Sequence, residues 1–227
     1  MTAVTWKLTE LSQWIEAHLP AEKETLESLK SLSRARYILN YHLVLARDAF
    51  AEYNQSDDAR LEMYSAIAGF DSGFSRAALI HEANIIAAIH TVRNYADILA
   101  QVVNSLVLPE PLSEFRASLY NVSTKLEDSC LKERMTELNE SYWFRYLVAF
   151  SNISKHRRLL ESNPTVTFDK DNNIESAGLR VQKFSYEFGS EEVTFEPCWG
   201  HHLVEEIYNV YRSILELGQE LNSHIMK

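Results

Sequence analysis

The stretch SRAALIHEANIIAAIHTVRNYADILAQVVNSLV, which runs from Ser75 to Val107, decides the fold class of this chain. Its apolar residues recur at steps of three and four, the spacing that lines up side chains along one face of an α-helix. Apolar side chains also occur on more than one face, so we predict a central helix that is covered on several sides. Pro109 and Pro111 follow the stretch and end the helix, because proline cannot continue it.

Most of the remaining chain also has helical spacing, and only 6 Gly and 5 Pro occur among its 227 residues. Scarce glycine and proline favour long helices over a turn-rich β fold. A turn is expected over Asn54–Asp58, with Asp58 as the N-cap of the helix that follows. We predict further helices over Thr5–His18, Glu22–Tyr53, Asp58–Phe70, Leu112–Leu126, Cys130–Asn139, Ser141–Leu160 and Trp199–Ile225.

A short region before the last helix, about residues 164–196, has a different pattern. Its β-branched and aromatic residues alternate over Thr165–Phe168, Leu179–Phe188 and Val193–Phe195, which is typical of strands. We predict a small antiparallel β insertion of two or three strands here. The predicted fold class is therefore all-α: a single domain over residues 1–227, built as an antiparallel helical bundle with this insertion before the last helix.

Composition limits the classes of function that this chain can have. The formal net charge of −10 favours solubility and argues against a broad surface that coats nucleic acid, yet it leaves room for a local basic site. The two cysteines, Cys130 and Cys198, are too few for a disulfide framework, and we expect reduced thiols. Met1–Trp6 lacks the pattern of a signal peptide, and the apolar run Ile98–Leu108 is too short to span a bilayer. We therefore expect a cytoplasmic protein with no membrane partner.

Two of the predicted helices carry polar residues where the apolar pattern predicts burial. The stripe on the central helix consists of His90, Asn94 and Asp97, with Arg93 at its edge. The stripe on the later helix consists of Arg145, Asn152 and His156. That helix ends in the densest basic cluster of the chain, Lys155, His156, Arg157 and Arg158. If the two stripes face each other, the cations would hold a phosphate and a histidine would move a proton.

Each stripe also has a purely structural interpretation. Lys and Arg at a helix C-terminus oppose the helix dipole and satisfy its last carbonyls. The side chains of His90, Asn94 and Asp97 would form a buried polar network that fixes the register of the helices. We expect the aromatic run Tyr142–Phe150 in the core rather than as a platform for bases.

Two segments carry distinctive motifs. Tyr146–Leu159 contains Asn-x-x-Lys-His-Arg near the end of a predicted helix, and Ala88–Asp97 contains Arg-x-x-x-Asp. Both resemble helices of uncharacterised bacterial proteins of the HEPN superfamily, a group of helical bundles, and the likeness loosely covers about residues 30–220. The resemblance implies a homodimer formed through bundle helices, acting in a bacterial defence or toxin–antitoxin system with a cognate antitoxin or other partner protein.

The resemblance further implies RNA or a nucleotide as the ligand, and metal-independent RNA cleavage without a cofactor as the activity. The catalytic residues would be His156, Asn152 and Arg93. The residues that bind the RNA phosphates would be Lys155, Arg157, Arg158 and Arg145, supported by His90, Asn94 and Asp97. Active members of the superfamily have an Arg followed a few residues later by His. No Arg stands at that distance before His156, and the formal matches elsewhere are Arg36 with His42 and Arg76 with His81.

Other functional classes remain open at this stage. No metal is expected, because Cys198-Trp-Gly-His201-His202 lacks a second ligand pair at a suitable spacing and is interpreted as a helix N-terminus. A non-enzymatic helical module for protein–protein interaction would need the polar stripes only for structure. A small-ligand binder would use the central aromatic residues, and an apolar cavity beside His90 would favour it.

Overall fold

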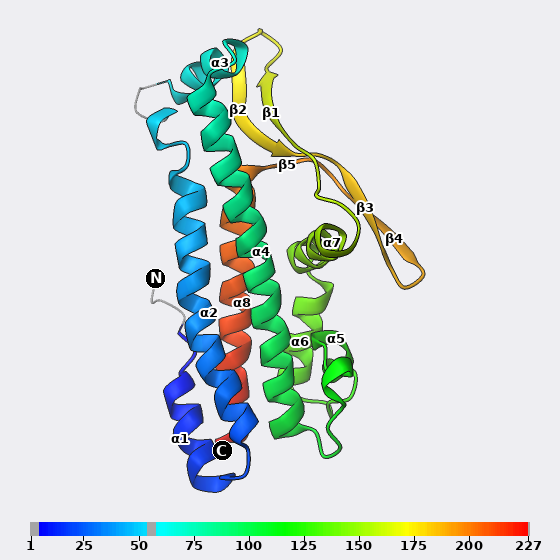
Figure 1. Cartoon of the computed structure of the whole chain (residues 1–227). Helices are drawn as coiled ribbons and strands as arrows, with labels where there is room; N and C mark the ends of the chain where they lie inside the picture. The colour runs from blue at the N-terminus through cyan, green and yellow to red at the C-terminus, as the bar shows by residue number, and fades with distance from the viewer. Residues whose placement is uncertain (1–4, 54–57, 227) are drawn as a thin grey trace. The chain divides into compact units, whose positions relative to one another are not determined.

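The computed structural model describes residues 5–53 and 58–226 of the chain (Figure 1). Met1–Val4 and residues 54–57 of the predicted turn lie outside the described residues. The structure is 67% helical, with eight α-helices, and 12% strand, in two antiparallel sheets. The prediction of an all-α fold is therefore wrong, because the described chain combines helices with two sheets rather than forming a pure helical bundle.

Eight α-helices make up most of the described residues. They are α1 Leu8–His18, α2 Lys23–Asp48, α3 Ala59–Ala68, α4 Ser72–Val107, α5 Leu119–Ser123, α6 Cys130–Glu140, α7 Tyr142–His156 and α8 Gly200–Ile225. The predicted N-cap is confirmed, since the Asp58 side chain accepts a hydrogen bond from the backbone of Leu61. The helix predicted over Leu112–Leu126 is wrong in extent: it is reduced to α5 and a 3-10 turn at Glu114–Arg116. Within the described residues, no helix combines the length and the apolar character that a membrane crossing needs.

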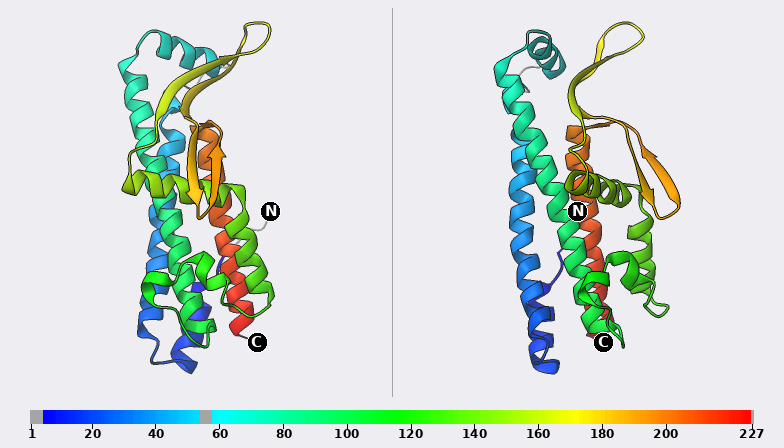
Figure 2. Two further views of the ribbon diagram at one scale, coloured as in Figure 1. Left: turned by 90° about the vertical axis from the view of Figure 1, so that its right-hand side faces the viewer. Right: turned by 45° about the vertical axis from the view of Figure 1, so that its right-hand side comes forward.

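Five strands form two sheets in place of the predicted two or three strands. They are β1 Ser162–Phe168, β2 Ile174–Val181, β3 Phe184–Phe188, β4 Glu191–Phe195 and β5 Cys198–Trp199. One sheet has the order β1-β2-β5, and the other is the β3–β4 hairpin, which Figure 2 shows as a separate pair of strands. The strand predicted over Leu179–Phe188 is thus two strands. The spacing between apolar residues increases from two positions to three between Val181 and Phe184. At this point the chain leaves the first sheet and enters the hairpin.

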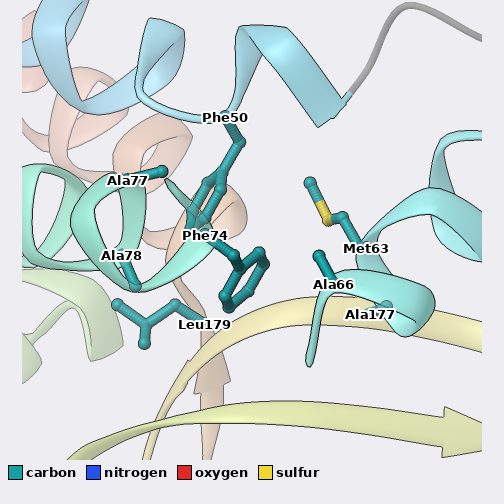
Figure 3. Close-up of a cluster of buried hydrophobic side chains, with 8 residues drawn as sticks. All are labelled: Phe50, Met63, Ala66, Phe74, Ala77, Ala78, Ala177 and Leu179. Carbon is teal, nitrogen blue, oxygen red and sulfur yellow. The ribbon is translucent and has the colours of Figure 1, made fainter. Parts of the chain in front are cut away.

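The first sheet is part of a hydrophobic core, which is why the fold is more than a bundle with an appendage. Ala177 and Leu179 of β2 are buried in one cluster with Met63 and Ala66 of α3, and Figure 3 shows Ala177 on the side of α3. The same cluster contains Phe50 and residues from the start of α4, namely Phe74, Ala77 and Ala78. Side chains from helices and strand therefore share one apolar interior, where burial stabilises both.

The first part of the central helix α4 is covered on fewer sides than predicted. Both Leu79 and Ile89 belong to the helical apolar spacing of Ser75–Val107, but Ile89 is fully buried whereas Leu79 is 65% exposed. The buried stripe in this part of α4 instead passes through His81, Ile85 and Ala88. The Nδ1–H of His81 donates to the Ala46 carbonyl at 2.6 Å, and this hydrogen bond allows the polar side chain to be buried. A polar residue therefore occupies a position on the buried face of the helix, where the sequence pattern predicted an apolar one.

The chain forms two compact units, to each of which α2, α4, α7 and α8 contribute a part. The first unit consists of Met1–Ile38, Thr91–Arg145 and Tyr208–Lys227, and the second of Leu39–His90 and Tyr146–Ile207. In the first unit the Trp6 indole donates to Asn222 Oδ1 at 2.9 Å. The second unit contains both sheets and the cluster of Figure 3.

Candidate functional site

Four consecutive basic residues, Lys155, His156, Arg157 and Arg158, stand at the end of α7, and we call them the basic tetrad. The helix ends at His156, and the backbone N–H groups of Arg157 and Arg158 still donate to the Ile153 carbonyl. All four residues are exposed. Among residues 5–53 and 58–226, no carboxylate pairs with their side chains, and none of the four donates to a carbonyl at the end of the helix. The tetrad is thus open to an anionic ligand.

The β3–β4 hairpin brings an aromatic side chain to the edge of the basic tetrad. Successive side chains of a strand point to opposite faces, and Phe184 and Tyr186 lie on the face of β3 that meets α7. Tyr186 Oη accepts a hydrogen bond from Asn152 Nδ2 at 2.8 Å. The Arg157 guanidinium lies over the Tyr186 ring, with Cζ 5.8 Å from the ring centroid. The tetrad, Asn152 and Tyr186 therefore form one continuous group within the second unit.

His90 of α4 contacts α7 through two serines. Its Nδ1 lies 3.0 Å from Ser151 Oγ, and its Nε2 lies 3.3 Å from Ser154 Oγ. The Ser154 hydroxyl donates to the Ser151 carbonyl, so Ser154 Oγ accepts from Nε2–H and Nδ1 accepts from Ser151. Burial, and secondly the charge of Lys155, lower the pKa of the His90 imidazole below its ordinary value. His90 is consequently neutral at pH 7 and positions α7 rather than adding a charge.

The remaining predicted site residues belong to the first unit. Arg93 is 14% exposed at its side chain, pairs with Asp97 at 3.3 Å and lies over the Phe144 ring at 5.1 Å. Asn94 is exposed, and Arg145 is half-buried. Arg93 and Asp97 thus form a pair along one helix, and the predicted convergence of these residues with His156 stays a prediction.

Three contributors to this group escaped the sequence reasoning: Tyr186, Ser151 and Ser154. The two serines have a signal in the sequence, because their spacing of three on α7 places them on one face next to the Asn152 stripe. Tyr186 has a weaker signal. It alternates with Phe184 and Phe188, but its contact with α7 depends on how the hairpin packs, which no local pattern records.

The histidines of the two formal Arg–His matches, His42 and His81, make structural contacts. His42 Nδ1–H donates to Asn84 Oδ1 at 2.9 Å. His81 is 3% exposed, and a Cβ at Gly200 would collide with its Nε2, so no ligand reaches it. The aromatic run of α7 is mostly core, as expected: Phe144, Tyr146 and Phe150 are buried.

The other features of the sequence lead to no second site. No group of three or more His, Cys, Asp or Glu residues among those described could hold a metal ion. Burial raises the pKa of the Cys198 thiol to about 11, which keeps it protonated. A hollow of about 150 Å³ in the first unit has a lining of mixed polar and apolar surface, and His90 is not among its lining residues, so it is not the apolar cavity beside His90 that a small-ligand binder would need. Its lining residues are Arg134, Glu137, Leu138, Ser141, Ser213, Glu216 and Leu217.

Comparison with known proteins adds no family to this picture: no family model, no curated protein and no solved structure matches the chain.

Proposed function

We propose that this protein binds the phosphate groups of RNA or of a nucleotide at the basic tetrad. The observation that carries the proposal is that four consecutive exposed basic residues lack a carboxylate partner among the described residues, in a chain whose net charge is −10. Arg offers a planar fork that matches phosphate oxygens, and Lys adds a compact charge. The half-buried Tyr186 beside Arg157 supports a nucleotide over a simple anion.

The competing structural role accounts for this arrangement less well. A cation near a helix C-terminus contributes about 0.3–1 kcal/mol, and the effect decays within the last turn. Arg157 and Arg158 lie beyond the end of α7, and no tetrad side chain reaches a terminal carbonyl among the described residues. The dipole therefore explains Lys155 and His156 better than it explains the two arginines.

A binding experiment tests the proposal directly. The wild-type chain and the double variant Arg157→Ala/Arg158→Ala are titrated into a fluorescent single-stranded RNA of about ten nucleotides, with anisotropy as the readout. Arg34→Ala is the matched control, because Arg34 is also exposed and lacks a partner among the described residues. We expect the double variant to lose about tenfold or more in affinity at low salt, while the control keeps wild-type affinity. Equal affinity in all three proteins would favour the interaction module.

RNA cleavage is a second proposal, which the exposed position of His156 favours. Its imidazole would take the proton of a 2′-hydroxyl, whose oxygen attacks the adjacent phosphorus; the bond to the 5′-oxygen breaks, that oxygen takes a proton from water, and a 2′,3′-cyclic phosphate forms. The tetrad cations would stabilise the charge on the phosphorane.

We expect His156→Ala to lower the cleavage rate by about 10²-fold or more, measured on denaturing gels in the presence of a chelator. His18→Ala, which removes another exposed histidine, serves as the control. Cleavage at the same rate in wild type and His156→Ala would end the catalytic proposal and leave the binding proposal intact.

A further inference from the structure

We propose that Tyr186 is a specificity-determining residue: together with Arg157 it forms a platform for one unpaired nucleobase. The site would then prefer single-stranded nucleic acid to a duplex and to a simple polyanion. This inference rests on the proposed function, because the basic tetrad must first hold the phosphates that flank the base.

The position of Tyr186 is fixed from two sides. Its hydroxyl accepts the hydrogen bond from Asn152, and its strand is paired with β4, where Tyr186 stands opposite Val193. Two residues earlier, Phe184 is buried, with its ring centroid 5.1 Å from those of Tyr146 and Phe195. A ring held in this way loses little conformational entropy when a ligand stacks on it or on its neighbour.

The guanidinium of Arg157 forms the solvent-facing part of the platform, above the Tyr186 ring. The guanidinium is planar and lies over the Tyr186 ring, while the residue as a whole is exposed. Unpaired bases stack on aromatic rings and on arginine planes, whereas the bases of a duplex are already stacked on each other. Lys155 and Arg158, on either side of Arg157 in sequence, are placed to meet the neighbouring phosphates.

The charges of the hairpin make the face opposite Tyr186 unfavourable to a polyanion. Glu187 alternates with Tyr186 along β3 and is paired across the hairpin with Glu192, and both carboxylates are exposed. Two like charges opposite each other on one face repel a nucleic acid backbone. The face that contains Tyr186 carries a single hairpin carboxylate among the described residues, Glu191, and it meets the basic tetrad, so it is the more favourable face.

The test compares three ligands with the full chain: a fluorescent single-stranded oligouridylate, a duplex of the same length, and inorganic polyphosphate as the competitor. For wild type we expect the single strand to bind at least about tenfold tighter than the duplex. Tyr186→Ala and Arg157→Lys should each weaken the single strand by about fivefold or more while polyphosphate competes as before, since both remove the platform. Tyr186→Phe keeps the ring but loses the hydrogen bond from Asn152, so it should weaken the single strand by less than Tyr186→Ala does. Ser185→Ala is the matched control on the same strand, because Ser185 is exposed and lies on the opposite face of the hairpin from Tyr186; it should bind like wild type.

The outcomes separate this inference from the proposed function. Equal losses for the single strand and for polyphosphate in Tyr186→Ala would show that the ring only supports the hairpin. A wild type that binds duplex as tightly as single strand would also overturn the inference, yet it would leave phosphate binding standing. Wild type that binds none of the three ligands would overturn both. If Tyr186→Ala lowers the unfolding temperature, Arg157→Lys decides, because an exposed side chain is changed without loss of charge.

Discussion

At the residue scale, the buried side chain of His81 has a clear effect on how the free energy of unfolding depends on pH. Burial is the main cause that lowers the pKa of the His81 imidazole below its ordinary 6.5. Above the unfolded pKa neither state binds a proton at His81, so its full contribution to stability is present. As the pH falls below about 6.5, the unfolded chain takes up a proton that the folded chain resists, and the free energy of unfolding decreases until the folded pKa is reached.

The variant His81→Asn should flatten this pH dependence, because the amide keeps a donor for the Ala46 carbonyl but does not titrate. We expect it to be about 1–3 kcal/mol less stable than wild type at pH 7.5, owing to lost packing against Phe50, and to show a smaller further loss at pH 5.5. Urea unfolding at both pH values measures the two effects, with His18→Asn as an exposed control. A variant that loses as much stability on acidification as wild type would contradict the assignment.

Some of the residues of the site and of the core could be predicted from the sequence, and others could not. The basic tetrad and Asn152 were identifiable because charge clusters and helical stripes are local patterns. The role of His81 was not, since its burial depends on the Ala46 carbonyl, 35 positions away along the chain. The catalytic role of Arg93 remains a prediction, although its ion pair with Asp97 and its contact with Phe144 give it a structural role already.

At the scale of elements, the strands explain where the predicted fold class failed. Periodicity identified the long helices, because each repeats its apolar spacing over several turns. The number of strands was predicted too low. Where the chain passes from one sheet to the other, between Val181 and Phe184, the alternation of apolar residues is shifted by only one position, so β2 and β3 resemble a single strand in the sequence. Whether a strand joins a core or covers one is a tertiary property, and the burial of Leu179 in one cluster with residues of α3 and α4 is of this kind.

This account predicts that the first sheet stabilises the second unit. Leu179→Ala should lower the free energy of unfolding by about 2–5 kcal/mol, because it leaves a cavity beside Phe74 and Ala78 (Figure 3). Glu175→Ala, an exposed position on the same strand, should change it by less than about 0.5 kcal/mol. Chemical unfolding followed by circular dichroism measures both. Similar, small effects for the two variants would mean that β2 lies outside the cooperative core.

At the scale of the whole molecule, charge organises the proposed function. A net charge of −10 repels polyanions in general, so binding must come from a local exception, and the basic tetrad provides one in the second unit. The division into two units could not be predicted, because helices such as α4 contribute to both and no linker or change of composition separates them.

The most direct test of phosphate binding by the basic tetrad is the salt dependence of RNA affinity. Anisotropy titrations between about 50 and 200 mM salt give the slope of log K against log salt, about −0.7 for each phosphate contact with a single strand. We predict that Arg157→Ala/Arg158→Ala makes this slope shallower by about 1.4, which corresponds to two lost contacts, while Arg34→Ala leaves it unchanged. An unchanged slope in the double variant would contradict the proposal that these arginines bind phosphate.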